Sequence, residues 1–204
     1  MTRPPPPHGS PRRRSMLRAL GAAALRAVFP AAGGTAAAIA TRAVGAEPEL
    51  TQFEISRDDE GVYLAFAVSL DLGRSPEEAL MKAVPLFFVA EAQTYRERWY
   101  WRNRRVAQTS RIWKIVFQPL TSTFRVTTEG GLSQNYATRA EALAAVSRSS
   151  RWKVAEPGHI EEGSRHYLEF EYRLDVNLLP RPMQIGVGGQ PDWQLSVRRS
   201  QRIN

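Results

Sequence analysis

The chain has 204 residues, of which 28 are basic and 20 acidic, and it contains no cysteine. Seven of the basic residues and none of the acidic ones lie in residues 1–46, so residues 47–204 carry a net charge of only +1. A nearly neutral body has no global field to attract polyanions. The lack of cysteine excludes disulfides, thiolate catalysis and cysteine-ligated metal sites.

Residues 1–46 have the features of a disordered basic leader and an export signal. Residues 1–15 are rich in proline and arginine and have nothing to bury. A weakly apolar stretch over residues 27–40 leads to small residues immediately before Glu47, as at a signal-peptide cleavage site. Pro30 interrupts this stretch well short of the roughly 20 apolar residues of a membrane span, so we expect no stable span after processing.

The export route has two interpretations. Arg13 and Arg14, followed after one residue by an apolar pair and Arg18, resemble the twin-arginine export pattern. If translation instead starts at Met16, the arginine pair is absent and an ordinary secretory signal remains. We expect cleavage after Ala46 and a periplasmic location; the competing interpretation is a cytosolic protein with an alanine-rich tail.

The first elements of the body are a hairpin and a helix. Residues 51–55 and 62–70 alternate apolar and polar, with a turn composition at 58–61 between them. The expected buried face comprises Phe53, Ile55, Val62, Leu64, Phe66, Val68 and Leu70. Ser75 and Glu78 have the spacing of a capping box, which predicts a helix over about residues 76–83.

The rest of the body reads mainly as strands. Strands are expected over 86–101, 111–117, 123–128, 151–155, 165–176 and 192–199, with a turn at 102–105. Thr138 and Glu141 form a second capping box, opening a helix to about Ser147. The proline- and glycine-rich segment 179–191 separates the last two strands, and residues 186–191 within it are expected to be a flexible hairpin connection.

About eight strands and two short helices indicate a mainly β fold in a single domain, residues 47–204. We expect an antiparallel β-sandwich with two short helices. The alternative is an α+β fold, in which one curved antiparallel sheet carries both helices on one face.

Several segments resemble, in the same order, an uncharacterised proteobacterial family. They are SPEEAL at 75–80, RWYW at 98–101, QPLT at 118–121, RLD at 173–175, LPRPMQ at 179–184 and DW at 192–193. Members of that family are described as a domain of unknown function or as proline-rich signal peptide proteins. The resemblance implies an exported single-domain protein whose gene often lies beside that of a membrane sensor kinase, and it implies no catalytic residue and no cofactor.

No catalytic, cofactor-binding or metal-ligating constellation emerges from the sequence. His159 falls in a turn, and His166 falls in a strand, where a histidine is more often a core or rim residue than a base. Glu169 and Glu171 share a strand face and are the carboxylate pair that a glycosidase could use. The same alternation predicts a solvated face with cross-strand charge pairing, which we favour.

The stretch RERWYWRNRR, residues 96–105, combines five arginines with three aromatic residues. Strand alternation places Tyr95, Glu97, Trp99 and Trp101 on one face, which we expect to be the core face opposite Trp113. An outward patch then remains, comprising Arg96, Arg98, Tyr100, Arg102, Arg104 and Arg105.

These observations favour an exported, non-catalytic binding or accessory module of the bacterial envelope. Its expected partner is an envelope protein, such as a membrane signalling protein, or an anionic envelope component; neither nucleic acid nor metal is expected. The first alternative is a cytosolic binder of single-stranded nucleic acid that uses residues 95–105. The others are an envelope-polymer hydrolase and a sandwich with a cavity for an apolar ligand.

Overall fold

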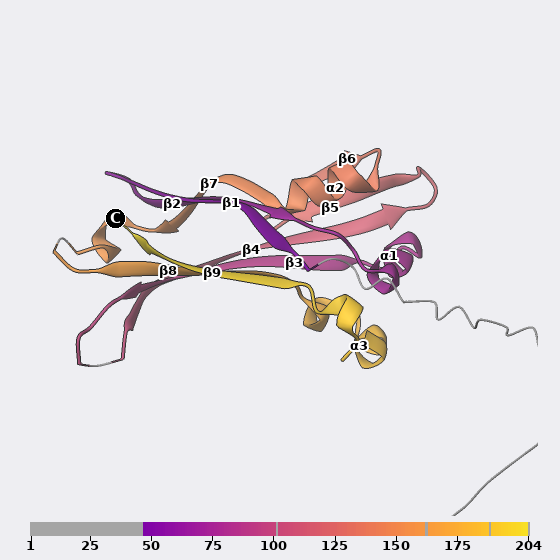
Figure 1. Ribbon diagram of the computed structural model, residues 1–204. Coiled ribbons are helices and arrows are strands. Elements are labelled where there is room, and N and C mark those ends of the chain that lie inside the picture. Colours follow the sequence, from indigo (N-terminus) through magenta and orange to yellow (C-terminus); the bar gives the residue numbers. More distant parts are fainter. Residues whose placement is uncertain (1–46, 101, 162, 188, 204) are drawn as a thin grey trace, which may run out of the picture. The chain divides into compact units, whose positions relative to one another are not determined.

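The computed structural model describes residues 47–100, 102–161, 163–187 and 189–203 (Figure 1). The predicted leader at 1–46 and the side chain of Trp101 lie outside the described residues. The expected hairpin is confirmed as β1 (Glu49–Asp58) and β2 (Gly61–Ser69), which pair antiparallel from Glu49 opposite Ser69 to Asp58 opposite Gly61.

The turn of this hairpin depends on one aspartate and one glycine. The Asp58 carboxylate accepts hydrogen bonds from the backbone N–H of Glu60 at 2.9 Å and of Gly61 at 3.1 Å. Gly61 has a φ of +142°, and a Cβ there would lie 2.4 Å from the Ala155 carbonyl oxygen. A side chain would collide with this carbonyl oxygen, so only glycine fits at this position.

Two antiparallel sheets form the fold, with strand orders β1-β2-β7 and β6-β5-β4-β3-β8-β9. The remaining strands are β3 (Leu86–Arg96), β4 (Arg104–Gln118), β5 (Thr123–Thr128), β6 (Ser133–Tyr136), β7 (Arg148–Ala155), β8 (His166–Leu174) and β9 (Ser196–Ile203). Figure 1 shows the three-stranded sheet lying over the strands of the larger one. The predicted β-sandwich is therefore confirmed.

Aromatic side chains from both sheets meet in the core. The ring of Phe66 on β2 lies 4.8 Å from that of Phe170 on β8 and 6.2 Å from that of Tyr172. Phe53 on β1 reaches the same Phe170 ring at 5.5 Å. The alternate residues of each strand supply this layer, as the period-2 pattern predicts.

The second capping box forms as expected and the first does not. Thr138 Oγ1 accepts from the Glu141 N–H at the start of α2 (Arg139–Val146), and the Glu141 carboxylate accepts from the Thr138 N–H. In α1 (Arg74–Met81) the N-cap is Gly73, and the Ser75 hydroxyl instead donates to Asp192 at 2.9 Å. A tertiary contact between distant segments has replaced the local cap.

The segment 179–191, which separates β8 from β9, contains a helix that was not expected. It contains α3 (Arg181–Val187) and leads into a 3-10 turn at Pro191–Trp193; two further 3-10 turns are Pro157–His159 and Val176–Leu178. The Gln184 side chain donates to the carbonyl oxygens of Asn177 and Leu179, both at 2.7 Å. These bonds hold α3 against the end of β8. The proline and glycine content of the segment gives no indication of this helix.

Candidate functional site

The β3–β4 connection, residues 97–103, carries three of the six predicted patch residues and is held at its base by hydrogen bonds. The backbone N–H of Glu97 donates to the Arg165 carbonyl at 2.8 Å. The Asn103 amide oxygen accepts from the Arg98 N–H at 3.3 Å, and its NH₂ donates to the Tyr167 hydroxyl at 3.0 Å. The loop is thus closed across its base and tied to β8, and Figure 1 shows the connection projecting beyond the sheets.

Trp99 and Tyr100 are at the tip of this connection, and both are exposed. Their side chains are 90% and 67% exposed, and their rings form an edge-to-face pair with centroids 4.2 Å apart at 85°. The prediction that Trp99 faces the core is wrong. Strand β3 and its pairing with β4 and β8 end at Arg96, so Trp99 lies beyond the strand on which the prediction relied.

The strand faces are also the reverse of those predicted around Tyr95. Leu86 and Phe88 of β3 pair with the buried Ile115 and Trp113 of β4, and Ala90, Ala92 and Thr94 are also buried, so the even-numbered residues of β3 face inward. Tyr95 therefore lies on the outer face, where its ring stacks on Tyr167 at 5.2 Å and 11°. Burial raises the pKa of Tyr95, with Glu169 adding to the effect and Arg105 opposing it.

Arg96 differs from the other patch arginines because it lies on the face of β3 that is directed to the core. Its side chain is 20% exposed and forms an ion pair with Glu161. Behind the tip, Glu97 pairs with Arg165 at 3.6 Å and with Arg202 at 3.5 Å. These glutamates neutralise the base of the connection. Neither Arg165 nor Arg202 carried a sequence signal, because Arg165 comes from the β7–β8 connection and Arg202 from β9, both far away in the chain.

The remaining patch arginines, Arg98, Arg102, Arg104 and Arg105, are exposed. Within the described residues, no carboxylate forms a salt bridge with any of them. The segments 96–105 and 161–165 together with Arg202 hold seven arginines and three glutamates, a local net charge of +4. The positive charge that is free to meet a partner is therefore concentrated beside Trp99 and Tyr100.

A recess of ≈ 750 Å³ lies between the tip and the β7–β8 connection. Residues 96–100 line one side, and Glu161 and residues 163–165 line the other. Beneath it, His166 is 2% exposed, with Nδ1 at 3.2 Å from the Ser164 carbonyl oxygen. Its Nε2 and the hydroxyl of Thr94 are buried without a hydrogen-bond partner among the described residues. The expectation that His166 is a core residue at a strand end is confirmed.

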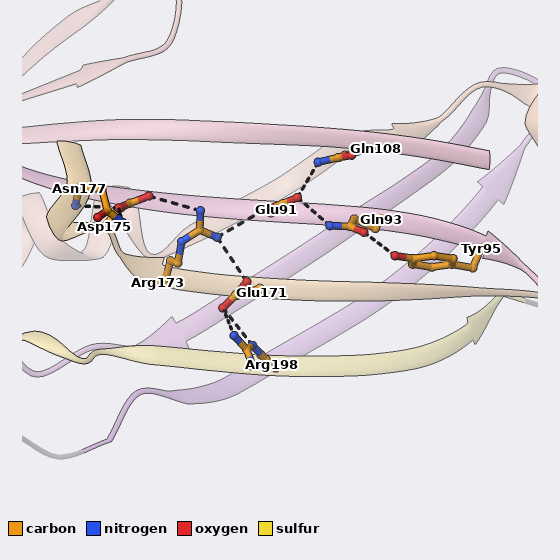
Figure 2. Close-up of polar contacts among 9 residues, drawn as sticks. All are labelled: Glu91, Gln93, Tyr95, Gln108, Glu171, Arg173, Asp175, Asn177 and Arg198. Carbon is orange, nitrogen blue, oxygen red and sulfur yellow. Dashed lines mark hydrogen bonds and ion pairs between the residues drawn. The ribbon is translucent and has the colours of Figure 1, made fainter. Parts of the chain in front are cut away.

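The outer face of the larger sheet carries the charge network shown in Figure 2. Arg173 on β8 reaches Glu91 at 3.4 Å, Glu171 at 3.3 Å and Asp175 at 3.3 Å. Arg198 on β9 donates twice to the other oxygen of Glu171, at 2.7 and 3.0 Å. The predicted cross-strand charge pairing on this face is confirmed.

Three uncharged side chains extend the same network (Figure 2). The amides of Gln93 and Gln108 each donate to Glu91 Oε1 at 2.7 Å, and the Tyr95 hydroxyl donates to Gln93 at 2.5 Å. The polar groups on these strands thus satisfy one another. Such a face stabilises the sheet rather than offering free groups to a ligand.

The carboxylate pair considered for hydrolysis lies beside this network. Glu169 is exposed, while arginine N–H groups contact both oxygens of Glu171. A recess of ≈ 480 Å³ on the outer face is lined by both glutamates and by Glu91. No oxygen of Glu171 is left free of arginine to protonate a leaving group, so the geometry gives the hydrolase alternative no support.

Across 47–203, leaving out the gaps, no three histidine or carboxylate residues gather as they would around a metal ion. No helix in the same ranges has the length and hydropathy to cross a bilayer.

Comparison with known proteins places the chain in one family. No curated protein and no solved structure matches it. A family profile matches residues 45–203, which is nearly all of the predicted body and both sheets. The chain therefore belongs to the family described as Domain of unknown function (DUF4390).

Proposed function

We propose that this chain is an exported, non-catalytic binding module of the bacterial envelope, which holds an anionic partner at the arginine–aromatic tip. We define this tip as Arg98, Trp99, Tyr100, Arg102, Arg104 and Arg105. The export-signal pattern of residues 1–46 supports the location. The resemblance to proteobacterial proline-rich signal peptide proteins supports the same location, and the partner could belong to a membrane signalling system.

The observation that carries the proposal is the contrast between paired and unpaired arginines. Arg96, Arg165 and Arg202 have glutamate partners, whereas the exposed arginines of the tip have none within the described residues. The hydrogen bonds of Asn103 at the base of the connection fix where the tip projects. A preorganised cationic surface with exposed aromatic rings binds anions without the entropic cost of ordering a loose loop.

The location is tested by fusing residues 1–60 to a reporter enzyme that is active only after export. We expect activity, and we expect mass spectrometry of the native protein to find Glu47 as the mature N-terminus. An inactive fusion, or a protein that keeps residues 1–46 in the cell, would contradict the proposal.

The binding site is tested by sedimenting the protein with isolated envelope fractions. Arg98→Ser with Arg104→Ser should weaken the interaction, and Arg57→Ser with Arg125→Ser serves as the control. The control pair removes the same charge from exposed strand positions outside the tip. Equal loss in both double variants would show that total charge, rather than the tip, governs binding.

A second candidate is a binder of single-stranded nucleic acid, which the exposure of Trp99 and Tyr100 favours. Exposed rings beside arginines can stack on bases. In this case single-stranded oligonucleotides should bind with a steep salt dependence, and Trp99→Ala should weaken that binding. Absence of binding at low salt would dismiss this candidate.

A further inference from the structure

We infer that the anionic partner of the tip is a lipid bilayer surface, with the rings of Trp99 and Tyr100 at headgroup level and the tip arginines on lipid phosphates. The inference rests on the proposed binding function of the tip and names its partner. It requires no membrane span, since a peripheral contact needs only a small apolar wedge and a basic surround.

The aromatic pair supplies the wedge. Trp99 and Tyr100 are 90% and 67% exposed and contact each other at 4.2 Å, so they form one small apolar surface at the end of a hairpin. Tryptophan and tyrosine have an apolar body and a polar edge, and this combination is favoured at the membrane interface. This surface is exposed to water, and no other part of the described chain covers it.

The arginines of the tip supply the electrostatic attraction to an anionic surface. Arg98, Arg102, Arg104 and Arg105 are exposed and lie within six residues of the rings in the chain, while Glu97 and Glu161 are paired with Arg202, Arg165 and Arg96. Among the described residues, the acids of this region are thereby paired, which leaves the net positive charge on the exposed arginines. An anionic headgroup layer complements this arrangement, because one surface accepts both the aromatic rings and the arginines.

The ring geometry distinguishes a bilayer from a nucleic acid. The two rings meet at 85°, so the edge of one covers part of the face of the other. Successive bases require open and roughly parallel ring faces on which to stack. An edge-to-face pair is instead a compact wedge, suited to a disordered headgroup region rather than to a row of bases.

Hydrogen bonds at the base of the loop hold the aromatic pair in position. Asn103 ties the Arg98 backbone to the Tyr167 hydroxyl, and Glu97 is hydrogen-bonded to the Arg165 carbonyl, so both ends of the loop are held. Figure 1 shows the β3–β4 connection projecting beyond the sheets. A held loop loses little conformational freedom on docking, which favours binding.

Co-sedimentation of the full chain with vesicles tests the inference. Phosphatidylcholine vesicles with and without phosphatidylglycerol are compared, and the leader with its seven arginines is constant in all variants. We expect Trp99→Ser to lower partitioning onto anionic vesicles about tenfold, through lost apolar contact. Arg98→Ser and Arg104→Ser should each lower it about fivefold, and high salt should reverse binding.

The control is again the exposed pair Arg57 and Arg125, whose replacement should leave tip-dependent partitioning within about twofold, because they lie outside the tip. Tryptophan fluorescence adds a readout of insertion: anionic vesicles should shift the emission of the wild type to the blue and protect it from acrylamide. Trp113, Trp152 and Trp193 are already buried, so Trp99→Phe should remove much of that change.

The inference is overturned if partitioning is unaffected by Trp99→Ser and Arg98→Ser, or if the emission does not shift. Tip-dependent binding to envelope fractions after lipid extraction, without binding to vesicles, would overturn it while leaving the proposed function intact. Preference for a single-stranded oligonucleotide over vesicles would overturn it in favour of the nucleic-acid candidate. Loss of every tip-dependent interaction would remove the proposed function together with the inference.

Discussion

The side-chain amide of Asn103 donates to the hydroxyl of Tyr167 over 3.0 Å, and this bond joins the β3–β4 connection to the neighbouring strand β8. The same amide accepts from the Arg98 N–H, so one residue both closes the loop and anchors it. Tyr167 is in turn stacked on Tyr95, which extends the anchor to β3. The position of Trp99 and Tyr100 therefore depends on Asn103, which is neither charged nor aromatic.

Asn103→Ala should loosen the tip while leaving the sheets intact. Losing two partly exposed hydrogen bonds should lower the free energy of unfolding by about 1 kcal/mol. Hydrogen exchange at residues 98–102 should accelerate more than exchange in β8. Asn135→Ala is the control, because its bond to Arg125 lies on another hairpin. If the exchange of residues 98–102 is unchanged, Asn103 does not hold the loop.

Glu171→Gln should weaken the outer face of the larger sheet. The substitution removes the charge that Arg173 and Arg198 share, although Arg173 keeps Glu91 and Asp175. Since Glu171 is partly exposed, we expect a loss of about 1 kcal/mol in urea unfolding. Glu169→Gln should change stability little, because Glu169 has no salt bridge within the described residues. An equal effect of the two substitutions would show that the network adds nothing.

Alkaline pH should destabilise the fold through Tyr172. Burial raises the pKa of this phenol well above its usual value, and its hydroxyl donates to the Val146 carbonyl at 3.3 Å. Above about pH 10 the unfolded chain releases the phenolic proton that the folded chain keeps, so the free energy of unfolding falls as pH rises. Below that pH both states are protonated and Tyr172 adds no slope.

Urea unfolding of Tyr172→Phe at several pH values measures this contribution. The variant should lose about 1 kcal/mol at neutral pH with the hydrogen bond, and it should show a shallower decline above about pH 10. Tyr136→Phe, at a partly exposed position, should retain the wild-type slope. An unchanged slope in Tyr172→Phe would mean that other groups cause the alkaline loss.

The two capping-box sequences should respond differently to substitution. Thr138→Ala removes a formed cap of α2 and should cost about 1 kcal/mol by thermal or urea unfolding. Ser75→Ala does not uncap α1, and its effect should depend on Asp192, to which the hydroxyl donates. Asp192→Ala should therefore abolish the effect of Ser75→Ala in a double-mutant cycle. Additive losses would indicate that the two residues act independently.

Local patterns predicted most of the strands and the sandwich. Alternation identified the hairpin around Asp58 and Gly61 because a half-buried strand must expose every second residue. The phase of the alternation was misassigned at Tyr95 and Trp99, because the even-numbered residues of β3, and not the odd-numbered ones, face the core. Strand β3 pairs as far as Arg96, and no sequence pattern marks where its partners β4 and β8 stop pairing.

The candidate site was likewise predicted in part from local sequence and decided in part by contacts between distant segments. The composition of residues 96–105 identified a cationic and aromatic segment, and four of its arginines, Arg98, Arg102, Arg104 and Arg105, together with Tyr100, are exposed as expected. The pairing of Arg96 with Glu161, and of Glu97 with Arg165 and Arg202, arises between segments far apart in the chain.

By itself, the sequence determined the antiparallel sandwich, the turn at Gly61, the α2 cap and the near-neutral charge of residues 47–204, because each follows from local spacing or composition. Only the tertiary structure decided which arginines are neutralised, that Trp99 lies in solvent, and that Ser75 contacts Asp192. These features depend on which distant strands and turns become neighbours, and this is set by packing of the whole core rather than by any single segment.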